Sequence, residues 1–472
     1  MIWHFENYKD NVAIIDDNGI SITYMELENE GQRIANAIAG RHLVFVMCEN
    51  SIGSVLGYTS FVNNNIVPLL LNRHLDKELL AKLVETYKPK YIWTPVEQAN
   101  DFTEYNTNQM YSYSNYVLLK TTFNIEYPLN NELCLLLTTS GSTGSPKFVR
   151  QSYTNVIKNA ESIVKYLEID NTERPITTLP MNYTYGLSII NSHFLVGATL
   201  LLTDKGLMQK EFWEFFRKEN ATSFGGVPYT YEMLERLRFF RMELPSLRYM
   251  TQAGGKLTPE LHKKFAEYAR DNDKKFIVMY GQCEATARMG YLPANKSLEK
   301  CGSMGIAIPG GKFHLIDVDG ADIEAPNITG ELVYEGDNVT LGYAECGEDL
   351  QRGDERGGIL KTGDMAQFDS DGYYYIVGRK KRFLKIYGNR VNLDEIDRMI
   401  KSAFGNIDCA SAGKDDHMYL FITDAGLAAQ VKQFVVNKTR LNSAAFKVIV
   451  VDQIPKNDAG KTLYRELEKY YE

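Results

Sequence analysis

The sequence predicts an α/β protein: a large N-terminal domain of packed β-sheets with flanking helices, followed by a small α+β domain. Short apolar runs alternate with stretches whose apolar residues recur every three to four positions, a pattern typical of strands alternating with helices that bury one face. Several runs end in glycine or proline, which favours a sheet with ligands at its carboxyl edge. At 472 residues the chain is too long for one typical core.

The apolar runs give the expected strands in chain order. In the large domain they are residues 42–47, 66–71, 90–95, 133–137, 177–181, 198–203, 222–228, 247–255 and 276–280. The expected helices are residues 155–167, 212–220 and 227–237. Residues 101–131 are rich in Asn, Tyr and Thr, so we expect a loop-rich connection there. In the small domain we expect strands at 418–424 and 446–452.

An anion-binding loop follows the expected strand 133–137. Residues 139–147, TSGSTGSPK, combine small side chains and two glycines, which let the backbone approach an anion, with the cation of Lys147. The loop is not a P-loop of the G-x-x-x-x-G-K-[ST] kind, because Pro146 fills the place of the second glycine and Phe148 that of the hydroxyl. We therefore expect a phosphate-binding loop of another kind.

This loop resembles the phosphate-binding signature of the adenylate-forming (AMP-binding) enzymes, which include acyl-CoA synthetases, aryl-acid ligases, luciferases and peptide-synthetase adenylation domains. The resemblance implies an acyl-CoA synthetase-like fold with a mobile C-terminal domain. It also implies that the loop and Lys147 hold the phosphates of ATP and that Thr143 contributes to a Mg²⁺ site. The loop residues implied are Thr139, Ser140, Gly141, Ser142, Thr143 and Gly144.

A second block, residues 276–293, resembles the family's Tyr-Gly-x-Thr-Glu motif. By resemblance Tyr280 stacks on adenine, Gly281 lets the backbone pass close to the nucleotide, and Glu284 ligates Mg²⁺, which prefers oxygen ligands. Gln282 lies within the motif and is expected to line the nucleotide. Cys283 stands where the family usually has threonine, and a thiol is a weaker hydrogen-bond donor than a hydroxyl.

A third block comprises residues 330–343 and 361–397. By resemblance Asp364 accepts hydrogen bonds from both ribose hydroxyls, Arg379 reaches the ribose or phosphate, and Lys381 is the hinge. Lys385 is expected to contact the nucleotide, and the turn Gly388–Arg390 resembles the loop that lines the acceptor's tunnel. The hinge divides the chain into residues 1–379, the AMP-binding domain, and 380–472, a small domain that rotates between half-reactions.

The last block, residues 455–467, resembles the family's Pro-x-x-x-x-Gly-Lys segment. Lys461 is then the catalytic lysine, which places a compact positive charge between the carboxylate nucleophile and the α-phosphate of ATP. The blocks stand in family order from residue 136 to residue 467, so chance similarity of one loop does not explain them.

The substrate pocket is expected to include Tyr183, Tyr185, Gly186, Tyr229 and Gly254. In adenylation domains for α-amino acids, an Asp binds the ammonium group at the position that corresponds here to Thr184. Because no carboxylate stands there, an α-amino acid is disfavoured. We expect three residues at the end of the run 247–255 to contact the nucleotide: Gly254, Gly255 and Lys256.

The implied chemistry has two steps and needs ATP and Mg²⁺. A small-molecule carboxylic acid attacks ATP to give an acyl-adenylate and pyrophosphate, and a thiol of CoA, or of the phosphopantetheine of an acyl carrier protein acting in trans, then takes the acyl group. One alternative is an adenylating ligase with an amine or hydroxyl acceptor. Another is an inactive nucleotide-binding scaffold, which Cys283 and Phe148 favour and the presence of Lys147, Glu284, Asp364 and Lys461 disfavours.

Composition excludes several other classes. The formal charge of −8 leaves no basic footprint for nucleic acid. The N-terminus, MIWHFENYKD, is polar and no apolar run reaches membrane-spanning length, so we expect a cytoplasmic protein with no membrane partner. Six scattered cysteines without a C-x-x-C pair favour free thiols, and the histidines show no metal spacing.

Overall fold

A computed structural model gives the fold, and it describes residues 1–138, 147–387, 389–405, 407–456 and 462–471. The chain divides into two compact units: Met1–Lys312 with Tyr334–Leu360, and Phe313–Val333 with Lys361–Glu472. The predicted boundary between residues 379 and 380 lies further along the chain than this division and stays a prediction. No helix within the described residues is long and apolar enough to cross a membrane.

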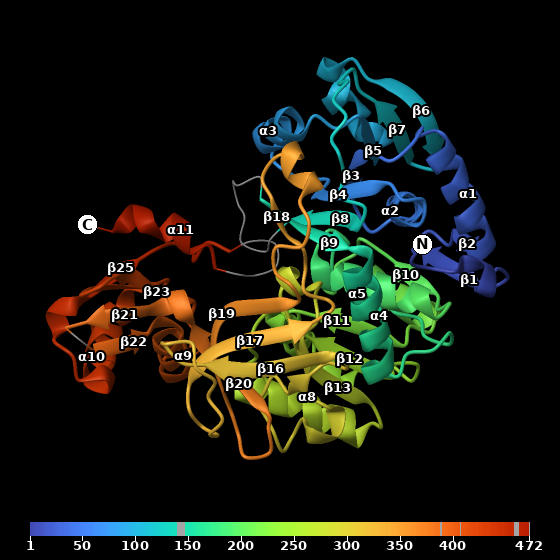
Figure 1. Ribbon diagram of the computed structural model, residues 1–472. Helices are drawn as coiled ribbons and strands as arrows, with labels where there is room; N and C mark the ends of the chain where they lie inside the picture. The colour runs from blue at the N-terminus through green and yellow to red at the C-terminus, as the bar shows by residue number, and fades with distance from the viewer. Residues whose placement is uncertain (139–146, 388, 406, 457–461, 472) are drawn as a thin grey trace. The chain divides into compact units, whose positions relative to one another are not determined.

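An eight-stranded sheet is the largest of the first unit, with strand order β18–β9–β8–β4–β3–β5–β7–β6 (Figure 1). Its central strands β8, β4, β3 and β5 are parallel, and antiparallel strands flank them on both sides. The bounds are β3 Leu43–Cys48, β4 Val67–Asn72, β5 Tyr91–Pro95, β6 Asn108–Tyr113, β7 Tyr116–Lys120, β8 Leu133–Thr138, β9 Phe148–Ser152 and β18 Gly342–Ala344.

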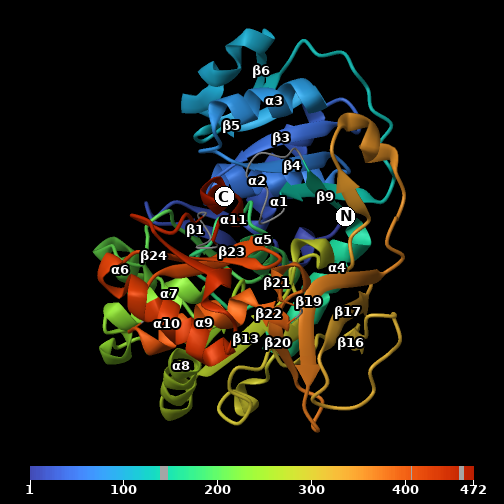
Figure 2. The same ribbon diagram turned by 90° about the vertical axis from the view of Figure 1, so that its left-hand side faces the viewer.

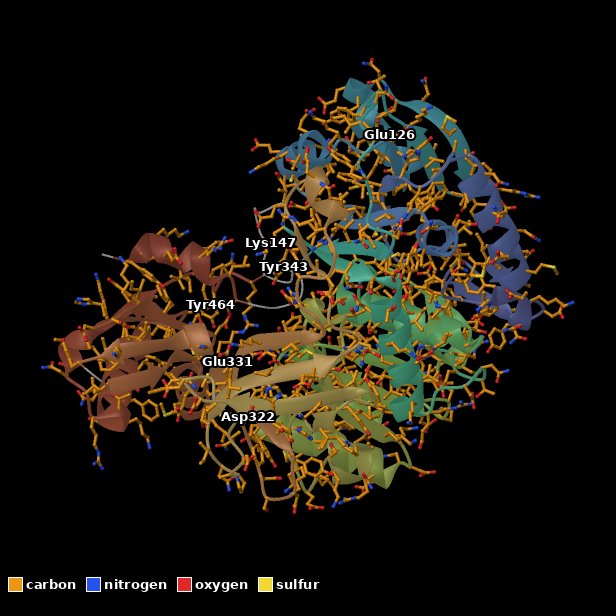
Figure 3. All side chains as sticks on the ribbon, in the orientation of Figure 1. Glu126, Lys147, Asp322, Glu331, Tyr343 and Tyr464 are labelled. Carbon is orange, nitrogen blue, oxygen red and sulfur yellow. The ribbon has the colours of Figure 1, made fainter. Side chains whose placement is uncertain are left out.

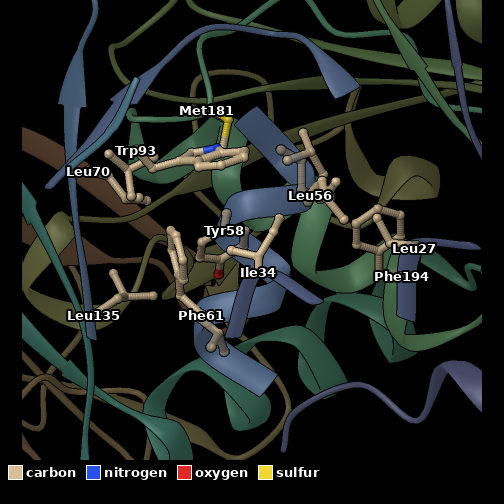
Figure 4. Close-up of a cluster of buried hydrophobic side chains, with 14 of the residues drawn as sticks. Leu27, Ile34, Leu56, Tyr58, Phe61, Leu70, Trp93, Leu135, Met181 and Phe194 are labelled. Atoms are coloured by element: carbon tan, nitrogen blue, oxygen red, sulfur yellow. The ribbon is translucent and has the colours of Figure 1, made fainter. Parts of the chain in front are cut away.

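Helices cover both faces of this sheet. Figure 2 shows α3 (Lys77–Tyr87) on one side of β3 and β4, and α2 (Ile52–Asn63) with α1 (Tyr24–Asn36) on the other. Strand residues alternate between the two cores, so that Val44 and Val46 pack towards α2 while Phe45 and Met47 pack towards α3. Figure 4 shows the α2 side, where Tyr58 and Trp93 are among the buried residues.

A second sheet in the first unit has the order β11–β12–β13–β14–β15, with its first three strands parallel. The bounds are β11 Ser223–Gly226, β12 Tyr249–Gln252, β13 Lys275–Tyr280, β14 Gly290–Tyr291 and β15 Ile306–Ala307. Residues Ile277 and Met279 of β13 join a core with α4 (Tyr153–Leu167) and α5 (Thr184–Leu195). Phe276, which points to the other face, packs on Tyr231 of α7 (Pro228–Arg236) and Phe265 of α8 (Pro259–Asp271).

The remaining elements of the first unit include a small sheet and a helix. The sheet has the order β10–β1–β2, with bounds Leu200–Leu202, Val12–Asp16 and Ser21–Thr23, and the helix is α6, Lys210–Lys218.

The second unit contains most of a four-stranded sheet in the order β16–β17–β19–β20. Their bounds are Gly311–Ile316, Gly330–Gly336, Ile359–Phe368 and Tyr374–Arg379. The other strands of this unit are β21 Phe383–Ile386, β22 Asn389–Asn392, β23 Cys409–Lys414, β24 His417–Ile422 and β25 Phe446–Val450, and its helices are α9 Leu393–Ala403, α10 Ala428–Thr439 and α11 Tyr464–Leu467. This mixture confirms the expected α+β pattern.

Two of the expected elements are wrong. Residues 177–181 form no strand; the extended backbone just before them makes only isolated bridges, Pro175 with Ser223 and Ile176 with Leu201. Residues 101–131 are not mainly loop, because they contain β6 and β7 and the end of the 3-10 segment Val96–Tyr105. The side chains of β6 are half-buried or exposed, so it lacks the apolar run that marks a central strand.

Two buried histidines make the fold sensitive to acid. The His193 ring contacts the Tyr249 hydroxyl at 3.0 Å. Burial lowers the pKa of both His193 and His262 from 6.5 to about 4. Between these values the unfolded chain binds more protons than the folded one, so the stabilisation is present above pH 6.5 and is lost as the pH falls towards 4. We expect each histidine to reduce the free energy of unfolding by about 1–2 kcal/mol between pH 7 and pH 5.

Urea unfolding at pH 7 and pH 5 tests this expectation. The His193→Gln variant should show a smaller loss of unfolding free energy on acidification than the parent chain. An equal loss in both proteins would contradict it.

Candidate active site

Gly281 follows the last residue of β13 where the backbone passes close to another segment. A Cβ at this position would lie 1.5 Å from the carbonyl oxygen of Ala287. The chain therefore needs glycine here for close packing. Just before it, Tyr280 is half-buried, and its hydroxyl accepts a hydrogen bond from Gln282 Nε2 at 3.3 Å.

The Gly281→Ala substitution should destabilise the first unit by about 3 kcal/mol or more, because a backbone carbonyl cannot move aside as a flexible side chain can. Thermal unfolding measures the effect. Gly353→Ala is the matched control: a Cβ there meets nothing within 4 Å. Equal melting temperatures for the two variants would contradict the packing account.

Glu284 is held by its backbone and its carboxylate alike. It lies in the short 3-10 turn Cys283–Ala285. Its carbonyl oxygen accepts hydrogen bonds from the backbone N–H and the hydroxyl of Thr340, both at 3.0 Å, and from Arg356 Nη1 at 3.2 Å. Its carboxylate oxygen Oε1 accepts the Tyr343 hydroxyl at 2.8 Å.

Tyr343 brings Lys147 and Glu284 together. Tyr343 lies in β18, and this strand pairs with β9. Strand β9 begins at Phe148, the residue that follows Lys147. The Lys147 ammonium lies 3.8 Å from the centroid of the Tyr343 ring, and the Arg356 guanidinium lies 4.7 Å from it; Figure 3 labels Lys147 and Tyr343 side by side. Burial, with the Glu284 carboxylate next, raises the pKa of Tyr343 to about 12, so its hydroxyl stays a donor. Two cations and one carboxylate thus surround one tyrosine.

The loop before β18 is fixed by α4. Ser152 caps this helix by accepting a hydrogen bond from the N–H of Asn155, and the Asn155 amide donates to the carbonyls of Asp337 and Val339 at 2.7 and 2.8 Å. These bonds hold the backbone that leads to Thr340 and therefore to Glu284.

The Tyr343→Phe substitution should reduce kcat/KM for the ATP-dependent reaction that the resemblance implies about 10- to 100-fold, with little loss of stability. It removes the hydrogen bond to a charged acceptor, worth about 1.5–3 kcal/mol, but keeps the ring beneath Lys147 and Arg356. Steady-state kinetics with melting temperature as the control measure this. Unchanged kinetics would mean that the hydroxyl does not position Glu284.

Several predicted residues gather near the end of β12. Gly254 has a positive φ of 83°, and a Cβ there would lie 2.8 Å from the Tyr183 hydroxyl. A Cβ on Gly255 would lie 2.9 Å from Pro228 Cγ, and Lys256 is exposed. Cys283 is buried. Glycine at position 254 thus lets the strand end pass close to Tyr183.

The pocket tyrosines differ in their surroundings. Tyr185 and Tyr231 are buried, and both hydroxyls donate to the Thr251 carbonyl oxygen, at 2.8 and 2.7 Å. Tyr229 is 56% exposed. A Cβ on Gly186 would lie 2.4 Å from the Pro180 carbonyl oxygen, so this glycine lets α5 begin close to the preceding segment.

In the second unit, Asp364 and Arg379 are paired across β19 and β20. Arg379 Nε lies 3.5 Å from Asp364 Oδ1, and the Asp364 carboxylate is buried while the Arg379 side chain is 64% exposed. Lys385 is exposed, and its backbone N–H donates to Asp415 Oδ1 at 2.8 Å. The backbone of Lys381 lies in the 3-10 turn Lys380–Arg382.

Several predicted residues lie outside the described residues, namely Thr139, Ser140, Gly141, Ser142, Thr143, Gly144, Gly388 and Lys461. Their roles remain proposals.

Three residues of the site were missed by sequence reasoning. Tyr343 and Arg356 contact Glu284 from more than fifty residues along the chain, and only the pairing of β18 with β9 could have placed them. Arg288 has a weak local signal, a single cation in the otherwise uncharged run 285–293, and its side chain is 1% exposed.

The described residues contain no group of three or more His, Cys, Asp or Glu side chains placed to hold a metal. A single carboxylate is nevertheless enough for Mg²⁺, which usually keeps several waters and shares phosphate oxygens with the protein. Glu284 fits this requirement, because only Oε1 of its carboxylate takes part in the contact with Tyr343.

Comparisons with known proteins agree with this geometry. A family model described as AMP-binding enzyme matches residues 2–344. The chain is 26% identical over 355 residues to an oxalate–CoA ligase of Saccharomyces cerevisiae, an alignment that covers 72% of this chain and 64% of that protein. It is 27% identical over 343 residues to an indoleacetate–CoA ligase of Aromatoleum aromaticum, covering 69% and 65%. Each match spans less than two-thirds of the relative's length.

Solved structures show the fold over nearly the whole chain. MatB from Rhodopseudomonas palustris with bound ATP aligns with a TM-score of 0.80 and 22% identity over 98% of this chain and 97% of that one. The o-succinylbenzoate CoA synthetase of Bacillus subtilis with ATP and a magnesium ion aligns with a TM-score of 0.77 and 21% identity, covering 97% and 96%. The predicted acyl-CoA synthetase-like fold is confirmed.

Proposed function

The chain belongs to the AMP-binding enzyme family, and from this premise we propose that it is an AMP-forming acid–thiol ligase. It activates a carboxylic acid with ATP and passes the acyl group to a thiol. The observation that carries the proposal is the arrangement of Lys147, Glu284 and Tyr343. The Lys147 ammonium, which can bind phosphate, lies against the Tyr343 ring, and the Glu284 carboxylate, which can bind a metal ion, accepts the hydroxyl of the same tyrosine.

In the first step, an oxygen of the acid's carboxylate forms a bond to the α-phosphorus of ATP while the bond to pyrophosphate breaks. In the second, a thiolate attacks the carbonyl carbon of the acyl-adenylate and AMP leaves. Lys147 and Lys461 offset the negative charge that gathers around phosphorus, and the protein otherwise contributes mainly positioning.

Glu284 and Thr143 are the residues proposed to hold Mg²⁺. When bound, the ion supplies positive charge to the phosphates. Arg356 and Thr340 hold the backbone of Glu284, and Tyr343 fixes the carboxylate, so this chain orients its acidic ligand before the nucleotide arrives.

The other nucleotide contacts are proposed residue by residue. Tyr280 stacks on adenine, with Gln282 fixing its hydroxyl, and Asp364 holds the ribose with Arg379 beside it. Residues 1–379 form the nucleotide-binding domain, and residues 380–472 rotate about Lys381 to exchange the two half-reactions.

CoA is the acceptor that the relatives favour, because the curated proteins reported above are CoA ligases. A carrier-protein phosphopantetheine offers the same thiol. The named relatives act on acids as different as oxalate and indoleacetate, so they do not define the acid used by this chain.

The test is pyrophosphate release with ATP, Mg²⁺ and hydroxylamine across a panel of carboxylic acids, because hydroxylamine traps an acyl-adenylate without a natural acceptor. We expect one class of acid to give turnover. Replacing hydroxylamine by CoA should then give a thioester detectable by mass. Turnover with hydroxylamine but no thioester with CoA or a carrier protein would indicate that the natural acceptor is an amine or a hydroxyl group.

A further inference from the structure

Arg288 is a buried cation whose partners are all uncharged. Its Nε donates to Ser188 Oγ at 3.1 Å and its Nη1 to the Tyr166 hydroxyl at 3.2 Å and to Met279 Sδ. The guanidinium lies over the Tyr185 ring, 4.4 Å from its centroid. No described carboxylate forms an ion pair with it, and Nη2 has no hydrogen-bond partner within the described part of the chain.

The other arginines whose burial the structure describes as complete or nearly so, Arg150 and Arg382, have carboxylate partners. Arg150, with none of its side chain exposed, pairs with Glu355 at 2.5 Å and donates to backbone carbonyls. Arg382 pairs with Asp394 and Asp397 at 2.8 and 2.9 Å. A buried charge without a counterion costs several kcal/mol of folding free energy, so the stability of the fold alone does not account for Arg288.

The position of Arg288 is nevertheless firmly fixed. Its carbonyl oxygen accepts hydrogen bonds from the side-chain amides of Asn159 and Asn338, both at 2.9 Å. Asn159, Ser162 and Tyr166 recur on one face of α4, and Ser162 Oγ is buried without a hydrogen-bond partner. The protein therefore holds the backbone of Arg288 in place, and the helix that supplies two of its partners, Asn159 and Tyr166, also carries an unsatisfied hydroxyl.

Arg288 lines a small cavity. Its lining includes Arg288, His193, Ser192, Tyr249 and Thr251, and among the lining residues that the structure describes Arg288 alone is charged. The neutral form of His193 dominates at pH 7, because burial lowers its pKa to about 4. The cavity volume is about 10 Å³, room for about one water molecule, so a larger group can enter only if lining side chains move.

This cavity adjoins the proposed acyl pocket. Thr251 of its lining accepts the Tyr185 and Tyr231 hydroxyls and precedes Gly254 by three residues. Arg288 follows Glu284 by four residues, so their Cα atoms are at most about 14 Å apart. Arg288 and the proposed metal ligand Glu284 thus lie on one short segment of the chain.

We propose that Arg288 binds a second carboxylate of the substrate, so that the acid activated by this enzyme is a short dicarboxylic acid. One carboxylate reacts with ATP, and the other takes charge-assisted hydrogen bonds from Nη2 of the guanidinium, because Nε and Nη1 already donate to Ser188, Tyr166 and Met279. This inference rests on the proposed function, because it names the substrate class of the same site.

The test compares matched acids in the hydroxylamine assay: succinate with butyrate, and glutarate with pentanoate, where a methyl group replaces the distal carboxylate. The enzyme should prefer the diacid by at least about 100-fold in kcat/KM, since a site built for a polar group discriminates strongly against its absence. Arg288→Met should lower kcat/KM for the diacid about 100- to 1000-fold and change the monoacid less than about threefold. Arg288→Lys should recover part of the loss.

Control variants separate recognition from folding. Arg150→Met removes a second buried arginine and should leave the ratio of diacid to monoacid activity unchanged. Ser188→Ala removes one contact that orients the guanidinium and should lower that ratio several-fold in a folded enzyme, which keeps the test open if Arg288→Met fails to fold. A parent enzyme with no preference for diacids, or variants that lower both activities equally, would overturn the proposal.

Binding without turnover distinguishes this proposal from the proposed function. If no acid releases pyrophosphate, the proposed function fails. In that case calorimetric titration of succinate and butyrate into the parent and Ser188→Ala proteins still tests Arg288. Tighter binding of succinate that weakens in Ser188→Ala supports the carboxylate site, and equal binding of both acids overturns it.

Discussion

Replacing Glu284 by glutamine should lower kcat/KM for adenylation about 100- to 1000-fold, a loss of about 3–4 kcal/mol of transition-state stabilisation. The amide keeps an oxygen that can accept the Tyr343 hydroxyl, and the backbone bonds from Thr340 and Arg356 do not involve the side chain. The substitution therefore removes the charge that a metal ion needs and leaves the position of the residue intact.

Pyrophosphate release measured over a range of Mg²⁺ concentrations shows whether this reason is right. The apparent Mg²⁺ requirement of Glu284→Gln should move to higher concentration. Glu345→Gln, the same change at an exposed glutamate of the same unit, should behave like the parent enzyme. A loss of rate with an unshifted Mg²⁺ dependence would assign Glu284 some other role.

Replacing Lys461 by alanine should lower the rate of adenylation about 100- to 1000-fold while ATP binding in the large domain persists. The expectation rests on the transition-state charge that a lysine ammonium stabilises at the α-phosphate. Because the contact is made only in the transition state, kcat should fall more than KM rises.

Lys469→Ala serves as the matched control, since it removes an exposed lysine eight residues further on. Single-turnover formation of the trapped acyl product compares the two variants. Equal rates for Lys461→Ala and Lys469→Ala would show that Lys461 is not the catalytic lysine, despite the resemblance of residues 455–467 to the family's segment.

The central strands were predictable because they are buried on both faces and so read as continuous apolar runs. Strands β3, β4 and β8 each lie within a residue of the expected ranges 42–47, 66–71 and 133–137. Strand β6 escaped prediction because its side chains are mostly exposed, and residues 177–181 misled because an apolar segment there packs without a strand partner.

The candidate site was predictable only in part, for a physical reason. Motifs could identify Lys147 and Glu284 by local resemblance, but their proximity depends on Tyr343, which lies 59 residues from Glu284 and is brought there by strand pairing. Arg288 gave only a weak signal, a single cation in the otherwise uncharged run 285–293, because the absence of a carboxylate partner in the fold cannot be read from the sequence.

Acid-dependent exchange of labelled pyrophosphate into ATP tests the central claim most directly, since it reports the reversible formation of an acyl-adenylate and needs no acceptor. The account predicts exchange that requires both Mg²⁺ and one class of carboxylic acid, and that is lost in the Glu284→Gln variant. Exchange that persists at the parent rate in Glu284→Gln, or a protein that binds ATP yet shows no exchange with any acid, would contradict it.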